Sequence, residues 1–154
     1  MRNAQRFGLA LVIGILLFAG CKTTPVAQRD RAVDRLIETI NSGNVEEITE
    51  LSQTPFVLDR ELLMLESDVQ TMWERLYGAG FSLEGAEVES VNPADSESYR
   101  TFSPSMEMRV YFRKYLADDG TVVRVASDQG TFVLLVGGRQ FFTPELYGLK
   151  GPIQ

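Results

Sequence analysis

The chain has 154 residues and a formal net charge of −6, with no histidine and a single cysteine. This composition excludes Ser-His-Asp and Cys-His catalytic arrangements and His-ligated metal sites, and we find no Gly-rich phosphate loop or G-x-S-x-G elbow. Nucleic acid is a poor partner for an acidic chain, because its phosphates require clustered Lys and Arg. We therefore expect no metal, no cofactor and no nucleic-acid partner.

The first 22 residues combine a basic start, an apolar run and a lone thiol. Arg2 and Arg6 precede an uncharged stretch over residues 7–20, and Cys21 follows two small residues. A secretory signal has these features. The 14 uncharged residues are fewer than the roughly 20 that a membrane-spanning helix needs. An ordinary membrane anchor and a plain secretory signal with a free thiol at Cys21 are the alternatives.

Phe18-Ala19-Gly20-Cys21 resembles the lipobox of bacterial lipoproteins, with Phe18 where leucine is usual. The resemblance implies cleavage between Gly20 and Cys21, diacylglycerol on the Cys21 thiol and usually a further fatty acid on the new N-terminus. Two or three acyl chains hold a protein stably at a membrane, because each buried methylene contributes about 0.8 kcal/mol. The residue after the cysteine is Lys22. An Asp at that position would resemble the signal that retains lipoproteins in the inner membrane of some Gram-negative bacteria. The expected location is therefore the bacterial cell envelope, with the outer membrane favoured over the inner.

Cleavage before Cys21 would leave 134 residues with 13 basic and 21 acidic side chains, a net charge of −8. This length suits one domain with a hydrophobic core. We expect a lipidated tether over residues 21–28 and a single domain over residues 29–154. Because an acylated Cys21 forms no disulfide, hydrophobic packing alone must stabilise that domain.

Helical periodicity predicts three helices in the first half of the domain. From Asp30 the apolar residues follow the spacing of one helical face, at Val33, Leu36, Ile37 and Ile40. Gly43 suits the end of this helix, and Asn44 followed by Glu47 is typical of a cap on a second, short helix. Ser67 with Gln70 indicates a capping box for a third helix. The buried face of that helix would hold Val69, Met72, Trp73 and Leu76, and Gly78-Ala79-Gly80 would end it.

Strands are predicted where the helical period breaks. A short strand, Phe56-Val57-Leu58, follows Pro55. A turn is expected at Asp59, and residues 60–65 can continue the strand beyond it. Apolar alternation predicts strands over residues 86–89, 106–113, 121–126 and 131–136, with a short last strand over 139–142. Turns are expected at 92–95, 118–120 and 128–130, with hairpins at the last two. Residues 96–105 read as a loop or a short surface helix, and the tail over 144–154 as turn-rich.

These elements predict an α+β domain in which three helices pack on one face of a curved antiparallel sheet of about four main strands. The order resembles the NTF2-like (cystatin-like) roll. The matching stretches are residues 36–51 as a helix pair, 55–59 as the first short strand, 68–77 as the third helix, and 130–138 as the penultimate strand and turn. Residues 139–142 depart from it, because many members carry a Trp there. The resemblance implies a conical cavity between sheet and helices, which some members use for isomerisation, dehydration or ligand binding.

The family resemblance also implies an acid or base and a hydrogen-bond donor in that cavity. The candidates are Asp59, Glu61 and Glu66 as acids or bases, and Tyr77, Tyr111 and Tyr115 as donors. We assign no catalytic residue, because a carboxylate without an identified partner is usually a solvated surface group. Tyr111 falls on the charged face of its predicted strand and is expected at the surface.

The possible pocket-lining residues are Asp59, Trp73 and Tyr77, although helical spacing favours Met72 and Trp73 as core residues. Three basic residues lie on or next to the predicted strand over 106–113: Arg109, Arg113 and Lys114. They are either a small cationic patch that binds an anion or a partner, or ordinary charged residues on a solvent-exposed sheet face.

Three functions follow from these features. The favoured one is a non-enzymatic lipoprotein module that binds a partner protein or an apolar ligand at the membrane. The second is an isomerase or hydratase that uses the helix–sheet cavity. The third is a subunit that dimerises or assembles through an exposed sheet face. A core closed by Trp73, Phe132 and Phe141 would direct attention to partner proteins.

Overall fold

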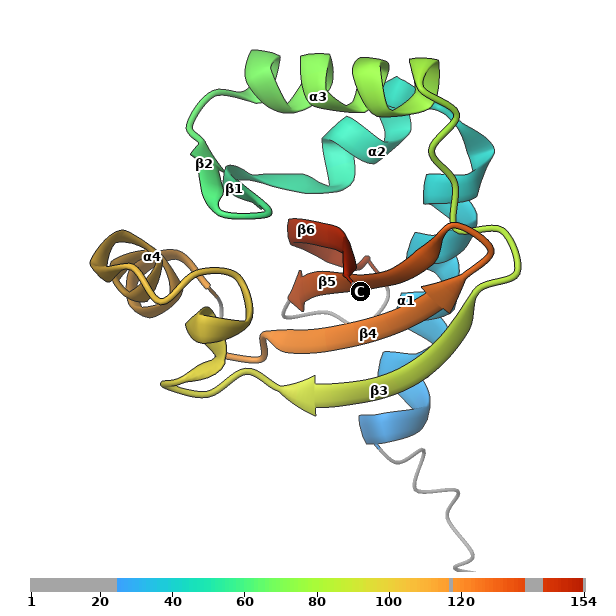
Figure 1. Cartoon of the computed structure of the whole chain (residues 1–154). Coiled ribbons are helices and arrows are strands. Elements are labelled where there is room, and N and C mark those ends of the chain that lie inside the picture. Colours follow the sequence, from blue (N-terminus) through green and yellow to red (C-terminus); the bar gives the residue numbers. More distant parts are fainter. Residues whose placement is uncertain (1–24, 117, 138–142, 154) are drawn as a thin grey trace, which may run out of the picture.

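The computed structural model describes residues 25–116, 118–137 and 143–153, with the backbone alone for residues 25–30. In this part of the chain, helices pack against one mixed sheet in an α+β arrangement (Figure 1), which confirms the predicted class. The elements are α1 (Pro25–Ser42), α2 (Val45–Leu51), β1 (Ser52–Leu58), β2 (Glu61–Leu63), α3 (Glu66–Gly78), β3 (Glu87–Pro93), the 3₁₀ helix η1 (Ser98–Thr101), α4 (Met106–Tyr115), β4 (Thr121–Ser127), β5 (Gly130–Gly137) and β6 (Glu145–Ile153). None of the helices described is both long enough and apolar enough to cross a membrane.

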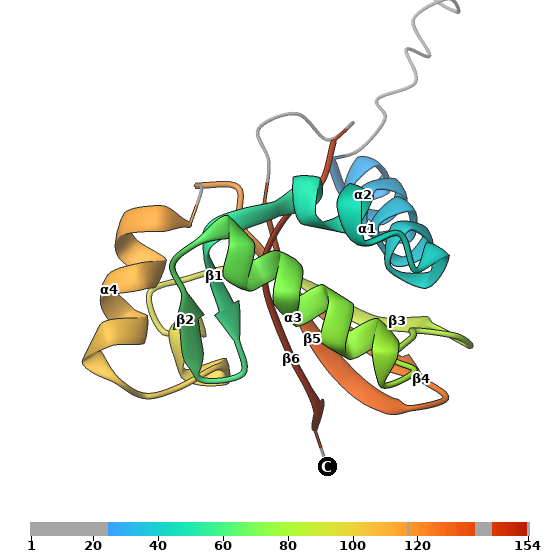
Figure 2. The same cartoon turned by 90° about the horizontal axis from the view of Figure 1, so that it is seen from above.

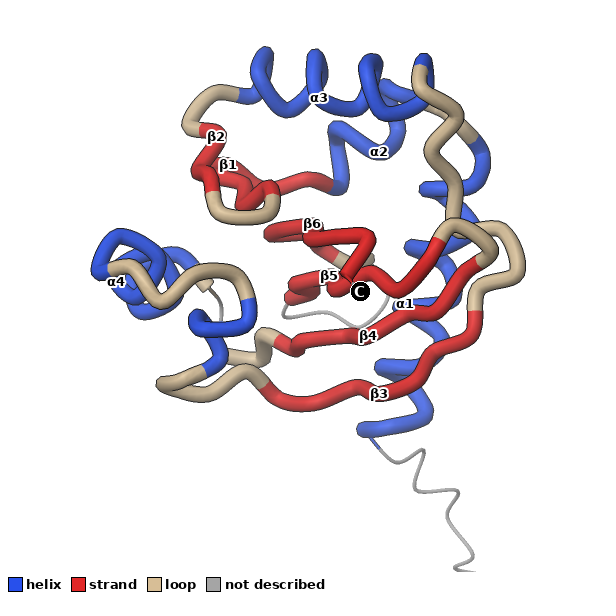
Figure 3. The backbone as a smooth tube through the Cα atoms, in the orientation of Figure 1, coloured by secondary structure: helices blue, strands red, loops and turns tan. Residues whose placement is uncertain are grey.

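The six strands form one curved sheet in the order β2-β1-β6-β5-β4-β3 (Figure 3). All neighbours are antiparallel except β1 and β6, which run parallel. The described part of the chain therefore has six strands and four α-helices, where the sequence predicted about four main strands and three helices. The hairpin predicted at residues 128–130 is confirmed between β4 and β5. The one predicted at 118–120 is wrong, because that turn joins α4 to β4.

The prediction of a turn-rich tail is wrong, because most of residues 144–154 form the inner strand β6. Within this strand, Gly148 lies where β6 passes close to β1. A Cβ on Gly148 would stand 2.8 Å from the Cβ of Val57. This glycine therefore permits close strand packing. The strand predicted over 139–142 lies outside the described residues.

The three predicted helices are present and pack with one face of the sheet. Asn44 caps α2, because its Oδ1 accepts a hydrogen bond from the Glu47 backbone N–H at 3.3 Å. The capping box of α3 is wrong: the helix begins at Glu66, no side chain caps it, and the Gln70 amide bonds Glu74 instead. Helix α1 begins at Pro25, earlier than the start predicted at Asp30, and the first helical turn tolerates proline.

The second large error is α4, which replaces the strand predicted over residues 106–113. The stretch alternates between apolar and polar residues, but Met108, Tyr111 and Phe112 also satisfy the helical spacing i, i+3, i+4, and these three are buried. Met106 and Val110, which the alternation placed inside, are 69% and 37% exposed. The Ser105 hydroxyl caps this helix by accepting from the Met108 N–H at 3.1 Å.

With η1, helix α4 covers part of the other face of the sheet, so the prediction that helices pack on one face only is wrong. Successive residues of β5 therefore belong to different cores: Leu134 faces α1 to α3, whereas Val133 and Leu135 face α4. Burial on both faces explains the continuous apolar run of β5. Viewed from above, α4 lies beside β2, at the end of the molecule opposite α1 (Figure 2).

Candidate functional site

The three residues predicted to line a pocket have separate structural roles. Trp73 is fully buried, and its indole N–H donates to the Ser52 hydroxyl at 3.0 Å. The Tyr77 hydroxyl donates to the backbone carbonyl of Ile40 at 2.9 Å. Burial, with a contribution from the Glu47 carboxylate, raises the pKa of Tyr77 to about 12, so this hydroxyl stays protonated at neutral pH.

Asp59 belongs to the turn between β1 and β2, as predicted. It adopts a left-handed backbone conformation with φ 54°, which Asp tolerates better than most residues. Its carboxylate accepts from the Gly151 N–H at 3.0 Å, and its own N–H donates to Leu149 O at 2.9 Å. Asp59 thus holds the tip of the hairpin against β6.

The space between the helices and the sheet is filled by side chains. The ring centroids of Trp73 and Phe56 lie 6.4 Å apart, and those of Phe81 and Phe132 lie 5.4 Å apart. Within the described residues the buried polar residues are Thr39, Thr49, Ser52 and Thr121, and no Asp or Glu is buried as a whole. One carboxylate oxygen, Asp119 Oδ1, is buried without a hydrogen-bond partner, in the turn between α4 and β4. Phe141, the third residue considered for closing this core, lies outside the described residues. These contacts leave the outer surface as the place to look for a site.

The other candidate donors and acids are scattered over the fold. Tyr111 is 1% exposed, which contradicts the surface position expected for it. Its hydroxyl donates to Tyr147 O at 3.0 Å, and burial raises its pKa. Tyr115 stacks on Tyr111 with ring centroids 5.7 Å apart. Glu61 and Glu66 are both exposed, so neither has the buried setting of a general base.

One groove lies between α3 and the hairpin formed by β1 and β2, and we call it the hairpin groove. Its volume is about 470 Å³. Its less exposed lining is apolar and comprises Leu58, Leu63, Met72 and Leu76. Its exposed lining is polar and comprises Glu61, Asp68, Thr71 and Arg75.

Local folding explains the composition of the hairpin groove. On α3, Asp68, Thr71 and Arg75 follow the i, i+3, i+7 stripe beside the buried face. On the hairpin, Glu61 pairs with Leu58, so both side chains point to the α3 side of the sheet. The chain between them, Met64 and Leu65, is 56% and 61% exposed. The sequence indicates this exposed apolar surface, because residues 62–65 are all apolar whereas a strand with one buried face needs apolar residues only at alternate positions.

A second groove of about 380 Å³ lies between α4 and the segment before η1, and we call it the arginine groove. Arg109 and Arg113 line it together, and both lie on a helix instead of the strand predicted for them. Lys114 is not part of its lining, and its ammonium lies 4.8 Å from the centroid of the Tyr115 ring. The remaining lining residues are Ala94, Asp95, Ser96, Phe112, Leu116 and Asp118.

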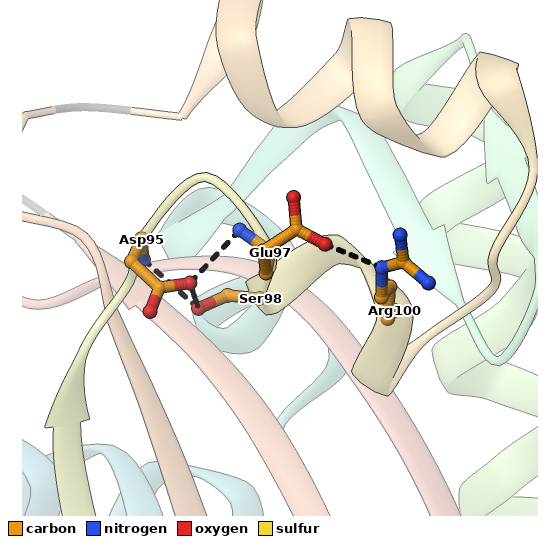
Figure 4. A network of polar contacts seen from close by, with 4 residues as sticks. All are labelled: Asp95, Glu97, Ser98 and Arg100. Carbon is orange, nitrogen blue, oxygen red and sulfur yellow. Dashed lines mark hydrogen bonds and ion pairs between the residues drawn. The ribbon is translucent and has the colours of Figure 1, made fainter.

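Asp95 begins a tight polar network at the edge of the arginine groove (Figure 4). Its carboxylate accepts from the Ser98 hydroxyl at 2.8 Å and from the Glu97 N–H at 2.9 Å. These hydrogen bonds lower the pKa of Asp95, first through the Ser98 hydroxyl. Arg100 forms an ion pair with Glu97 on the next turn. The network fixes the loop that forms one wall of the groove.

Two comparisons, with family models and with curated proteins, give no match. No protein-family model matches this chain. No curated protein matches its sequence either. Within the described residues there is also no group of three or more Cys, Asp or Glu side chains that could hold a metal ion. Function must therefore be inferred from the two grooves and their positions in the fold.

Proposed function

We propose that the chain is a membrane-anchored bacterial lipoprotein whose single domain binds a partner protein in the hairpin groove and performs no chemical step. One observation carries the binding role: a groove of about 470 Å³ whose base is apolar, beside the exposed Met64 and Leu65. Contiguous apolar surface of this kind on a folded protein typically marks a site of interaction. The filled space around Trp73 supports binding at the surface over chemistry in a helix–sheet cavity.

The position of the groove suits a tethered protein. In Figure 1 the start of α1 and helix α3 lie at opposite ends of the molecule. Three residues lie between Cys21 and Pro25, so the two Cα atoms are at most roughly 14 Å apart in extended chain. A lipid on Cys21 would therefore hold the α1 end near the membrane and leave the hairpin groove facing away from it. A partner at the envelope would meet the groove unobstructed by lipid.

The groove also indicates the chemistry of the partner. Its apolar base requires apolar side chains, and its rim holds two carboxylates, Glu61 and Asp68, against one guanidinium, Arg75. The surrounding domain is acidic as well, since cleavage before Cys21 would leave a net charge of −8. The proposed occupant is a segment of another envelope protein that carries apolar side chains next to Lys or Arg.

We propose the NTF2-like fold for this domain on the order of its elements. A helix pair, a short hairpin, a third helix and the strands β3 to β6 follow one another as in that roll. Helix α4 is an addition between β3 and β4 that covers the face opposite α1 to α3. In this fold the family cavity is the region that Trp73 and Phe132 occupy here.

The anchor is tested by the mass of the mature N-terminus. We expect a chain that starts at Cys21 and carries two or three fatty acyl groups, because the lipobox resemblance implies both steps. Cys21→Ser should abolish lipidation and release the protein from the membrane fraction. Mass spectrometry of the purified protein measures the first outcome and fractionation the second. An unmodified Cys21 thiol would overturn the anchor but leave the groove proposal intact.

The groove is tested by site-specific photocrosslinking in cells. A photoreactive residue in place of Thr71, which is exposed inside the groove, is expected to trap one partner protein. The same residue in place of Gln70 is the control, because Gln70 is exposed on the neighbouring side of α3 and does not line the groove. Thr71→Trp should fill the groove and reduce the affinity of the trapped partner at least tenfold, about 1.4 kcal/mol.

Identical adducts from positions 70 and 71 would contradict a site confined to the groove. An adduct with the mass of two copies of this chain would contradict a separate partner and support self-association instead. Far-UV circular dichroism of each variant shows whether it has kept its fold.

A further inference from the structure

We infer that the arginine groove is a second binding site, which takes a small organic oxyanion: a carboxylate or phosphate attached to an apolar group. The inference stands apart from the hairpin groove, because it rests on different residues and a different face of the fold. Arg109 and Arg113 lie four residues apart on α4 and line the same groove of about 380 Å³. Residues at this spacing are neighbours on a helix surface, so both guanidinium groups can reach one anion.

The two arginines have no carboxylate partner in the described part of the chain. Ion pairs elsewhere in that part join Arg100 to Glu97 and Arg124 to Glu89. Like charges at this helical spacing repel each other, and a bound oxyanion between them would replace repulsion by two attractive contacts. Guanidinium groups suit this role because their fixed N–H geometry matches the oxygens of carboxylate and phosphate.

Two acidic residues, Asp95 and Asp118, also line the groove, and within the described residues only the first is engaged in hydrogen bonds to its own loop. The Asp95 carboxylate is held by the Ser98 hydroxyl and the Glu97 N–H, so it serves the turn before η1 (Figure 4). Asp118 is exposed and forms no ion pair with the described residues. Asp118 therefore lowers the positive potential of the groove without closing it, and its removal should strengthen anion binding.

The apolar part of the ligand is inferred from the rest of the lining. Phe112 and Leu116 lie on the same helix as the arginines or directly after it, and Ala94 comes from the opposite wall. Phe112 is held in place by Phe102, with ring centroids 5.8 Å apart. A ligand with an apolar body beside its charged group would contact both parts of this surface. A bare inorganic anion would use the arginines alone.

The test is calorimetric titration of the full chain in phosphatidylcholine nanodiscs, with empty nanodiscs as the blank. The probes are phenyl phosphate and benzoate, compared with inorganic phosphate and phenol. We expect at least one aromatic oxyanion to bind more tightly than both comparison compounds and to weaken as salt rises. Whichever of the two binds more tightly identifies phosphate or carboxylate as the charged group.

Substitutions then locate the site. Arg109→Ala and Arg113→Ala should each weaken the binding of that probe about tenfold, the size of one charge-assisted hydrogen bond. Asp118→Asn should tighten it severalfold. Lys114→Ala is the matched control, because it removes a cation from the same helix outside the groove and should change the affinity less than twofold. Circular dichroism verifies that each variant is folded.

Two outcomes would overturn the inference. One is that neither aromatic oxyanion binds more tightly than inorganic phosphate and phenol. The other is that the arginine substitutions weaken binding no more than Lys114→Ala does. Neither result bears on the hairpin groove, where no residue is changed.

Discussion

Replacing Trp73 with alanine is expected to lower the free energy of unfolding by about 3–5 kcal/mol, the usual cost of removing a large buried aromatic side chain. Trp73 is fully buried and packs against Phe56, Tyr77 and Phe81. Its removal would leave a cavity where α3 meets the sheet. Because natural domains are stable by only about 5–15 kcal/mol, this single change should remove a large share of the total.

A polar contact adds to this cost. The Trp73 indole donates to the Ser52 hydroxyl, which in turn donates to the Ile48 carbonyl at 2.8 Å, at the end of α2. Trp73→Phe keeps most of the ring volume but removes the N–H. We expect it to cost about 1–3 kcal/mol, since the buried Ser52 oxygen loses its donor.

Urea unfolding followed by far-UV circular dichroism measures both changes, because Trp73 is the only tryptophan and its fluorescence is lost with it. Glu74→Ala is the matched control on the exposed side of the same helix and should stay within about 0.5 kcal/mol. A cost below about 1 kcal/mol for Trp73→Ala would contradict a filled interior and restore the cavity expected from the family resemblance.

The sequence predicted those elements whose local pattern and burial agree. In α1, residues at the helical spacing, such as Leu36 and Ile40, are the ones buried against the sheet. The caps and turns at Asn44 and Asp59 were also predictable, because each depends on a side chain bonded to a nearby backbone or on a tolerated left-handed conformation. These interactions are set within a few residues, so they can be read without tertiary contacts.

The elements that the sequence analysis misread depend on contacts between distant segments. Residues 106–113 fit both a strand and a helix period, and burial of Tyr111 against the sheet decides for the helix. The sequence indicates Arg109 and Arg113 as a possible patch, yet only the helix places them in one groove. The hairpin groove has the same origin: α3 and the hairpin form it together, and neither segment alone indicates its shape.

Gly148 shows the same dependence on distant contacts, and its substitution is the second test of the fold. It pairs with Val57 on one side and with Leu135 on the other, between the parallel β1 and the antiparallel β5. A Cβ at this position would stand 2.8 Å from the Val57 Cβ and 2.9 Å from the Val57 carbonyl oxygen. The second contact is with backbone, which a rotamer change cannot relieve. Gly148→Ala is therefore expected to lower the free energy of unfolding by about 1–3 kcal/mol, and Gly148→Val by more.

The matched control is Gly78→Ala at the end of α3, where a Cβ would meet nothing within 4 Å. Alanine there restricts the unfolded chain and suits a helix, so we expect a gain of up to about 1 kcal/mol. The two glycines thus predict opposite signs for one chemical change, measured by the same urea titration. If Gly148→Ala proved neutral, β6 would not pass this close to β1. The parallel β1–β6 pair, which joins the hairpin and its groove to the rest of the sheet, would then need revision.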